Sequence, residues 1–117
     1  KSNFENLDVW KKSCRLTVKL HELLEGTKSF WIKEQILRSE LSIPSNIAEG
    51  VTEIAILIFA DSSTLQKDLG RIADSVYIAI QIGIINKKDG KIIIDELVSL
   101  TKMLQSLKNS LTVTYNL

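Results

Sequence analysis

Residues 35–50 decide the fold, and they read QILRSELSIPSNIAEG. On a helix that turns about 100° per residue, the polar and apolar side chains of this segment fall on opposite arcs. The division continues past Pro44, which removes one backbone donor and presses on the carbonyl of Glu40. We therefore predict an amphipathic helix that bends at Pro44 instead of ending there. The polar arc comprises Gln35, Arg38, Ser42, Ser45, Asn46 and Glu49, and the apolar arc Ile36, Leu37, Leu41, Ile43, Ile47 and Ala48.

The polar arc of this helix has two interpretations. It is either the solvated face of a kinked helix or a polar network, buried within the bundle or across a subunit contact. The network interpretation involves Arg38, Ser42, Asn46 and Glu49. A long arc of amides and hydroxyls favours it, because solubility alone is usually served by charged side chains. Glu40 is the exception in the segment, since it lies within the apolar arc and needs a partner or an opening to water.

Apolar residues elsewhere recur at spacings of three, four and seven positions, which is the pattern of amphipathic helices. Four helices joined by short connections are typical of an up-down-up-down bundle. We therefore predict one all-α domain over residues 1–117, with Ser29 capping the second helix and Asp89 or Gly90 capping the last. The other three helices are predicted over residues 7–24, 53–85 and 91–111, with turns near 26–29, 50–52 and 86–90.

The third of these helices is ambiguous on propensity alone. Residues 54–60 and 76–85 are rich in β-branched side chains, which suit strands. Between them Leu65, Leu69 and Ile72 keep helical spacing, and no hairpin turn breaks the run. We therefore predict a single long helix that is stabilised by burial more than by intrinsic propensity.

The composition fits a small globular domain. Apolar residues make up 44% of the 117 residues and charged residues 25%, which excludes a disordered chain. A formal net charge of +1 gives no bulk attraction to nucleic acid or membrane, so such binding needs a local patch. The sequence has no basic-then-apolar leader and no apolar run long enough to span a bilayer. With the single Cys14, these features lead us to expect a cytoplasmic protein.

Catalytic residues are not apparent in the sequence. Cys14 and His21 are seven positions apart, about 10 Å along one helix, which is too far for a thiolate–imidazolium pair. The chain has neither the Glu-x-x-His pairs of bundle metal sites nor a glycine-rich phosphate loop. We therefore expect no enzymatic activity, no cofactor, no metal and no small-molecule substrate.

A cationic stripe on the first helix is the main candidate for binding. It consists of Lys11, Lys12, Arg15 and Lys19, with no acidic residue between Val9 and His21. Such a stripe would contact the phosphates of nucleic acid and read shape more than base identity. The alternative is that the stripe is only a solvated helix face. A second, weaker cluster is Lys87, Lys88 and Lys91.

The motif around Pro44 resembles that of a known family. Residues 42–50, SIPSNIAEG, preceded by Gln35 and Arg38, are similar to the signature of four-helix-bundle proteins associated with intervening sequences in bacterial 23S rRNA. Residues 4–10, FENLDVW, are similar to the opening motif of that family. The family usually carries an arginine shortly after the glycine, where this chain has VTE at 51–53.

The resemblance implies a four-helix bundle that assembles into a homo-oligomeric ring, a pentamer. Relatives include the accessory protein of diversity-generating retroelements, which binds a reverse transcriptase and nucleic acid through a basic surface. We therefore expect a non-catalytic RNA-binding or ribonucleoprotein accessory protein. The alternative is a structural scaffold or protein-interaction module without affinity for nucleic acid. The motif residues expected in a polar network or subunit contact are Gln35, Arg38, Ser42, Pro44, Asn46 and Glu49.

Overall fold

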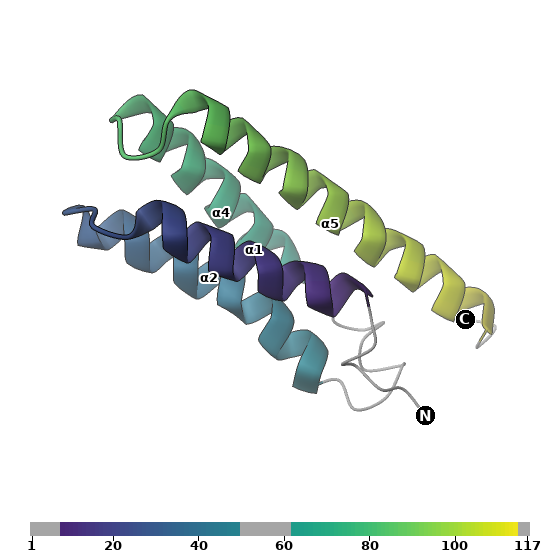
Figure 1. Ribbon diagram of the computed structural model, residues 1–117. Coiled ribbons are helices and arrows are strands. Elements are labelled where there is room, and N and C mark those ends of the chain that lie inside the picture. Colours follow the sequence, from purple (N-terminus) through teal and green to yellow (C-terminus); the bar gives the residue numbers. More distant parts are fainter. Residues whose placement is uncertain (1–7, 50–61, 115–117) are drawn as a thin grey trace.

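The computed structural model describes residues 8–49 and 62–114. These residues form four helices and no strand, which confirms the predicted all-α helical bundle. Figure 1 shows the helices lying lengthwise beside one another. They are α1 (Asp8–Leu24), α2 (Phe30–Glu49), α4 (Ser63–Gln81) and α5 (Lys87–Thr114).

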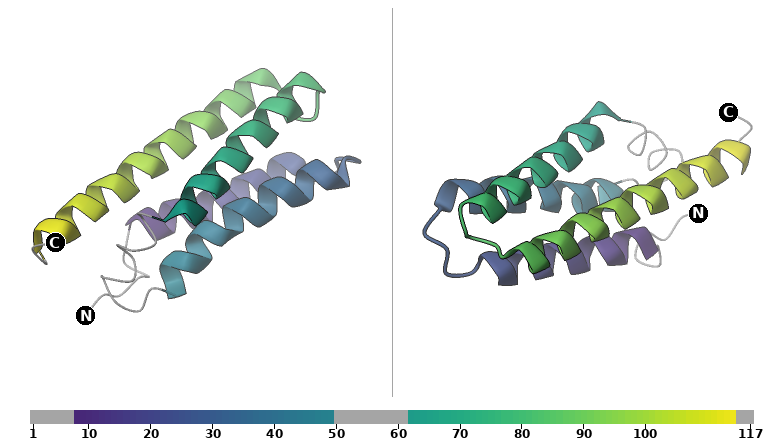
Figure 2. Two further views of the ribbon diagram at one scale, coloured as in Figure 1. Left: turned by 180° about the vertical axis from the view of Figure 1, so that it is seen from behind. Right: turned by 90° about the horizontal axis from the view of Figure 1, so that it is seen from above.

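Each described helix packs against two others. The helix α1 contacts α2 and α5, and α4 contacts the same two helices, so α1 and α4 occupy opposite corners of the bundle. Figure 2 shows α4 lying along both α2 and α5. The colour sequence in Figure 1 shows the chain reversing direction between α1 and α2 and again between α4 and α5. None of the four described helices is both long and apolar enough to cross a bilayer.

The core is formed by one apolar stripe from each helix. Its members recur every three or four residues, so they line the inward face of each helix. Burying one such leucine or isoleucine side chain stabilises the fold by about 1.5–3 kcal/mol relative to leaving it exposed. The stripes include Leu16, Leu20 and Leu24 of α1, Ile36, Ile43 and Ile47 of α2, Leu65, Ile72 and Val76 of α4, and Ile93, Leu100 and Leu104 of α5.

The second helix continues through its proline. Pro44 is buried inside α2, which runs on to Glu49. The prediction that the helix does not end at Pro44 is therefore correct.

The third predicted helix is shorter than expected. A continuous helix over 53–85 is wrong, because Ser62 has an extended backbone with φ −82° and ψ 152° and therefore interrupts it. The Ser62 side chain accepts a hydrogen bond from the Leu65 backbone N–H at 3.2 Å and so acts as the N-cap of α4. At the other end α4 stops at Gln81, and Gly83 has a φ of 82° that favours glycine. The predicted stretch 54–60 lies outside the described residues.

The last helix begins earlier than expected. Asn86 precedes α5, and its Oδ1 accepts a hydrogen bond from the Asp89 backbone N–H at 2.8 Å. Neither predicted cap is correct, because Asp89 and Gly90 both lie inside the helix, and Gly90 is buried. A Cβ at this position would lie 2.3 Å from Cδ1 of Ile80. Gly90 therefore leaves room for the Ile80 side chain, which would have to move if a larger residue took this position.

Candidate functional site

The cationic residues of α1 line a groove between α1 and α5. Lys12, Arg15 and Lys19 occupy positions i, i+3 and i+7, which lie on one side of a helix. Together with Leu16 and Glu96 they surround a depression of about 220 Å³. Leu16 is buried at the core, whereas Arg15 is exposed and Lys19 is half-buried. We call this depression the α1–α5 groove.

The groove has a positive charge that is only partly neutralised. Lys12 Nζ forms an ion pair with Glu96 Oε2, and the Lys12 side chain is only 17% exposed. The hydrogen bond from Lys12 holds the pKa of Glu96 below its usual value, and the charges of Lys19 and Arg15 act in the same direction. Among the described residues, Arg15 and Lys19 have no ion-pair partner. Three cations facing one carboxylate leave the groove with a net charge of +2.

The other predicted cationic residues lie outside the groove. Lys11 is exposed on α1, one turn before Arg15, and extends the positive surface beyond the groove lining. Lys87 and Lys88 are exposed at the start of α5, and Lys91 Nζ lies 3.2 Å from Asp95 Oδ2. Positive charge on the described surface is therefore more concentrated on α1 than at the start of α5.

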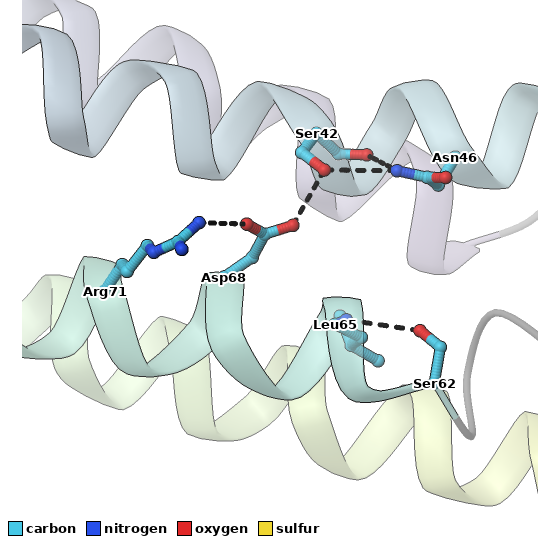
Figure 3. A network of polar contacts seen from close by, with 6 residues as sticks. All are labelled: Ser42, Asn46, Ser62, Leu65, Asp68 and Arg71. Carbon is cyan, nitrogen blue, oxygen red and sulfur yellow. Dashed lines mark hydrogen bonds and ion pairs between the residues drawn. The ribbon is translucent and has the colours of Figure 1, made fainter.

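A polar network joins α2 to α4, as Figure 3 shows. Ser42 Oγ donates a hydrogen bond of 2.7 Å to Asp68 Oδ2. Asn46 Nδ2 donates to the Ser42 carbonyl at 2.7 Å and to Ser42 Oγ at 3.1 Å. Asp68 is buried, and Arg71 Nη1 lies 3.9 Å from its other carboxylate oxygen. The network fixes the lateral position of the two helices, because a buried carboxylate is stable only where such partners meet it.

The structure separates the six motif residues of α2. Ser42 and Asn46 belong to the network, whereas Arg38 is exposed and pairs with Glu34 one turn earlier on the same helix. Gln35 is half-buried and Pro44 is buried, and the side chain of Glu49 lies outside the described residues.

Asp68 and Glu96 are the site residues that the sequence analysis missed. Asp68 is an acidic residue within the apolar stripe of α4, between Leu65 and Ile72. That position is a signal of the same kind as the one that singled out Glu40. Nothing in the local sequence distinguishes Glu96 from other acids, because its role comes from Lys12, which lies 84 positions away.

Glu40 is fully buried between α1 and α2. Ser13 Oγ donates a hydrogen bond to Glu40 Oε1 at 3.5 Å, and a second hydrogen bond joins Thr17 Oγ1 and Glu40 Oε2. Thr17 Oγ1 also donates to the Ser13 carbonyl at 3.0 Å. A hydroxyl has only one proton to donate, so both bonds form at once when the carboxylic acid is the donor to Thr17. Burial raises the pKa of Glu40 to about 8, which agrees with a neutral acid.

The two residues considered for nucleophilic catalysis lie apart on α1. Cys14 is half-buried in the middle of α1, and His21 is exposed in the last turn of the same helix. Burial raises the pKa of the Cys14 thiol, which disfavours the reactive thiolate. Over the described ranges no group of three histidine, cysteine, aspartate or glutamate side chains is arranged to hold a metal ion.

These features define an all-α four-helix bundle with a positively charged groove between α1 and α5 and a partly buried polar network between α2 and α4. The chain belongs to the 23S rRNA-intervening sequence protein family, whose model matches residues 5–106. This match confirms the family resemblance drawn from the motifs at 4–10 and 42–50. No curated protein matches the chain.

Proposed function

We propose that this protein is a non-catalytic, homo-oligomeric RNA-binding bundle, a ribonucleoprotein accessory protein that holds RNA phosphates at the α1–α5 groove. The observation that carries the proposal is the concentration of Lys12, Arg15 and Lys19 around one depression. The total charge of the chain is only +1, so this local excess is what an RNA backbone would respond to. The family to which the chain belongs is described by its association with an rRNA intervening sequence.

The lining of the groove indicates how RNA would be recognised. Its five side chains are three cations, one leucine and one glutamate, and none is aromatic. Base stacking on aromatic rings is therefore not available within the groove, and backbone phosphates are the matching ligand. The proposal predicts recognition of RNA shape more than sequence, as expected for structured RNA. A homo-oligomer would repeat the groove once per protomer and multiply the attraction.

The experiment that tests the proposal is the binding of a structured RNA hairpin over a series of salt concentrations. If a protomer uses the three α1 cations that have no ion-pair partner among the described residues, Lys11, Arg15 and Lys19, the slope of log affinity against log salt is about −2 to −3 per protomer. Reversing Lys11, Arg15 and Lys19 to glutamate should abolish binding. Lys12 is left unchanged in this variant, because Lys12→Glu would place a second carboxylate directly beside that of Glu96.

A matched control carries the same change in total charge elsewhere. Lys28, Lys67 and Lys102 are exposed and lie outside the groove lining and outside both cationic clusters. Reversal of these three lysines to glutamate should leave most of the affinity in place. Equal losses in both triple variants would mean that only the net charge matters, and the groove would not be the site. Absence of binding by the unchanged protein at low salt would reject RNA as the ligand.

The second candidate function is a protein-interaction scaffold, and exposed apolar side chains favour it. Trp31, near the start of α2, is 65% exposed, and Ile78 and Ile82 are exposed near the end of α4. These two helix ends lie at the same end of the bundle in Figure 1. Exposed apolar side chains are typical of contacts between proteins where they form a contiguous patch, and these three lie near the same end of the bundle. A protein without RNA affinity but with a stable oligomeric mass would support this function.

A further inference from the structure

We infer that Glu96 sets the strength of phosphate binding at the α1–α5 groove by competing with the phosphate for Lys12. This inference rests on the proposed function and adds to it the residue that regulates affinity. The supporting contact is the ion pair between Lys12 Nζ and Glu96 Oε2, within a lining that also includes Arg15 and Lys19.

The ion pair is in the right place for such competition. Lys12 is largely covered, so its ammonium group is held at the groove wall, while the Glu96 side chain is 39% exposed. A phosphate that approaches Arg15 and Lys19 enters a space that already contains the Glu96 carboxylate. The two anions repel each other, and Lys12 can be fully neutralised by only one of them.

The competitor is present at physiological pH. The hydrogen bond from Lys12, with the nearby charges of Lys19 and Arg15, holds the pKa of Glu96 below its usual value. Glu96 is therefore ionised throughout the neutral range, and protons do not switch it. The groove of the unchanged protein consequently offers two cations without ion-pair partners among the described residues, and removal of the carboxylate would offer a third.

The size of the effect follows from counterion release. One additional phosphate contact steepens the slope of log affinity against log salt by about 0.7–0.9. If this contact adds nothing to the affinity at 1 M salt, it increases the affinity at 0.1 M salt about five- to eightfold per protomer. Glu96→Gln should therefore bind RNA more tightly than the unchanged protein, and the gain should shrink as salt rises.

The matched control lies next to Glu96 on the same helix. Asp95 is an exposed acid whose carboxylate lies 3.2 Å from Lys91 Nζ, outside the groove lining. Asp95→Asn changes the total charge by the same amount as Glu96→Gln. We would measure the affinity of the full chain for one labelled RNA hairpin across a salt series, for the unchanged protein and both variants. A double variant, Lys12→Gln with Glu96→Gln, tests whether the gain passes through Lys12.

The inference predicts a five- to eightfold gain in affinity and a steeper slope for Glu96→Gln at about 0.1 M salt, and less than a twofold gain for Asp95→Asn. In the double variant the slope should return to that of the unchanged protein. An unchanged or weaker affinity of Glu96→Gln overturns the inference, as does an equal gain in both single variants. If the unchanged protein binds no RNA, the proposed function fails; binding by Glu96→Gln alone would then still support competition at the groove, and no binding by either would reject both.

Discussion

Replacing Glu40 with glutamine should remove a pH-dependent loss of stability. Glu40 is fully buried between α1 and α2, and burial raises its pKa from 4.5 to about 8. In the unfolded chain this carboxyl ionises above its ordinary pKa, whereas the folded protein retains the proton until about pH 8. The free energy of unfolding therefore falls as pH rises between 4.5 and about 8 and levels off above that range.

The magnitude follows from the difference between the two pKa values. At about 1.4 kcal/mol for each pH unit, the interval from 4.5 to about 8 corresponds to about 5 kcal/mol over the whole range. Between pH 5 and pH 8.5 the expected change is about 4 kcal/mol. Small domains are stable by about 5–15 kcal/mol in total, so this effect is large enough to measure. Glutamine keeps the size of the side chain and can donate a hydrogen bond to Thr17 without ionising.

The assay is urea unfolding followed by circular dichroism at pH 5, 7 and 8.5, at one protein concentration. The difference in unfolding free energy between Glu40→Gln and the unchanged protein should shift in favour of the variant by about 4 kcal/mol from pH 5 to pH 8.5. Glu22→Gln, at an exposed position on α1, is the control and should give no such shift. Parallel pH profiles for Glu40→Gln and the unchanged protein would refute the argument that Glu40 is neutral in the folded state.

Two further predictions concern the contacts between helices. Asn46→Ala removes both hydrogen bonds to Ser42, the α2 residue that bonds Asp68 of α4, and should cost about 1 kcal/mol and lower the thermal midpoint by a few degrees. An unchanged midpoint would reject a structural role for the network. Gly90→Ala places a Cβ 2.3 Å from the Ile80 side chain and should destabilise the bundle by about 1–3 kcal/mol, with partial recovery when Ile80 is shortened to valine. Gly70→Ala is the control for this change, because nothing lies within 4 Å of the added atom on α4, and helix propensity should make it neutral or stabilising by up to about 1 kcal/mol.

The sequence analysis was most successful where a helix has one strong apolar stripe. It placed the first helix within one residue of its observed start. Of the apolar arc predicted for α2, Ile36, Ile43 and Ile47 are buried as expected, whereas Leu41 is 54% exposed. It failed at two helix boundaries, where a single polar side chain ends the regular structure. Ser62 caps α4 and Asn86 Oδ1 accepts the Asp89 backbone N–H, and neither residue disturbs the apolar spacing on which the prediction relied. Capping depends on one hydrogen bond at one residue, whereas periodicity averages over many.

The sequence motifs at 4–10 and 42–50 identified the family. The sequence by itself also determined that the chain forms amphipathic helices and which helix carries the cationic stripe. These are local properties, because the spacing of residues along one helix fixes which side chains share a face. Only the tertiary structure decided which faces meet. It directs Lys12 to Glu96 across 84 positions, Ser42 to Asp68 across 26, and Thr17 to Glu40 across 23. Periodicity gives the direction of a side chain around its own helix axis but not the neighbour, the register or the charge that it will face there, and these depend on how the four helices pack.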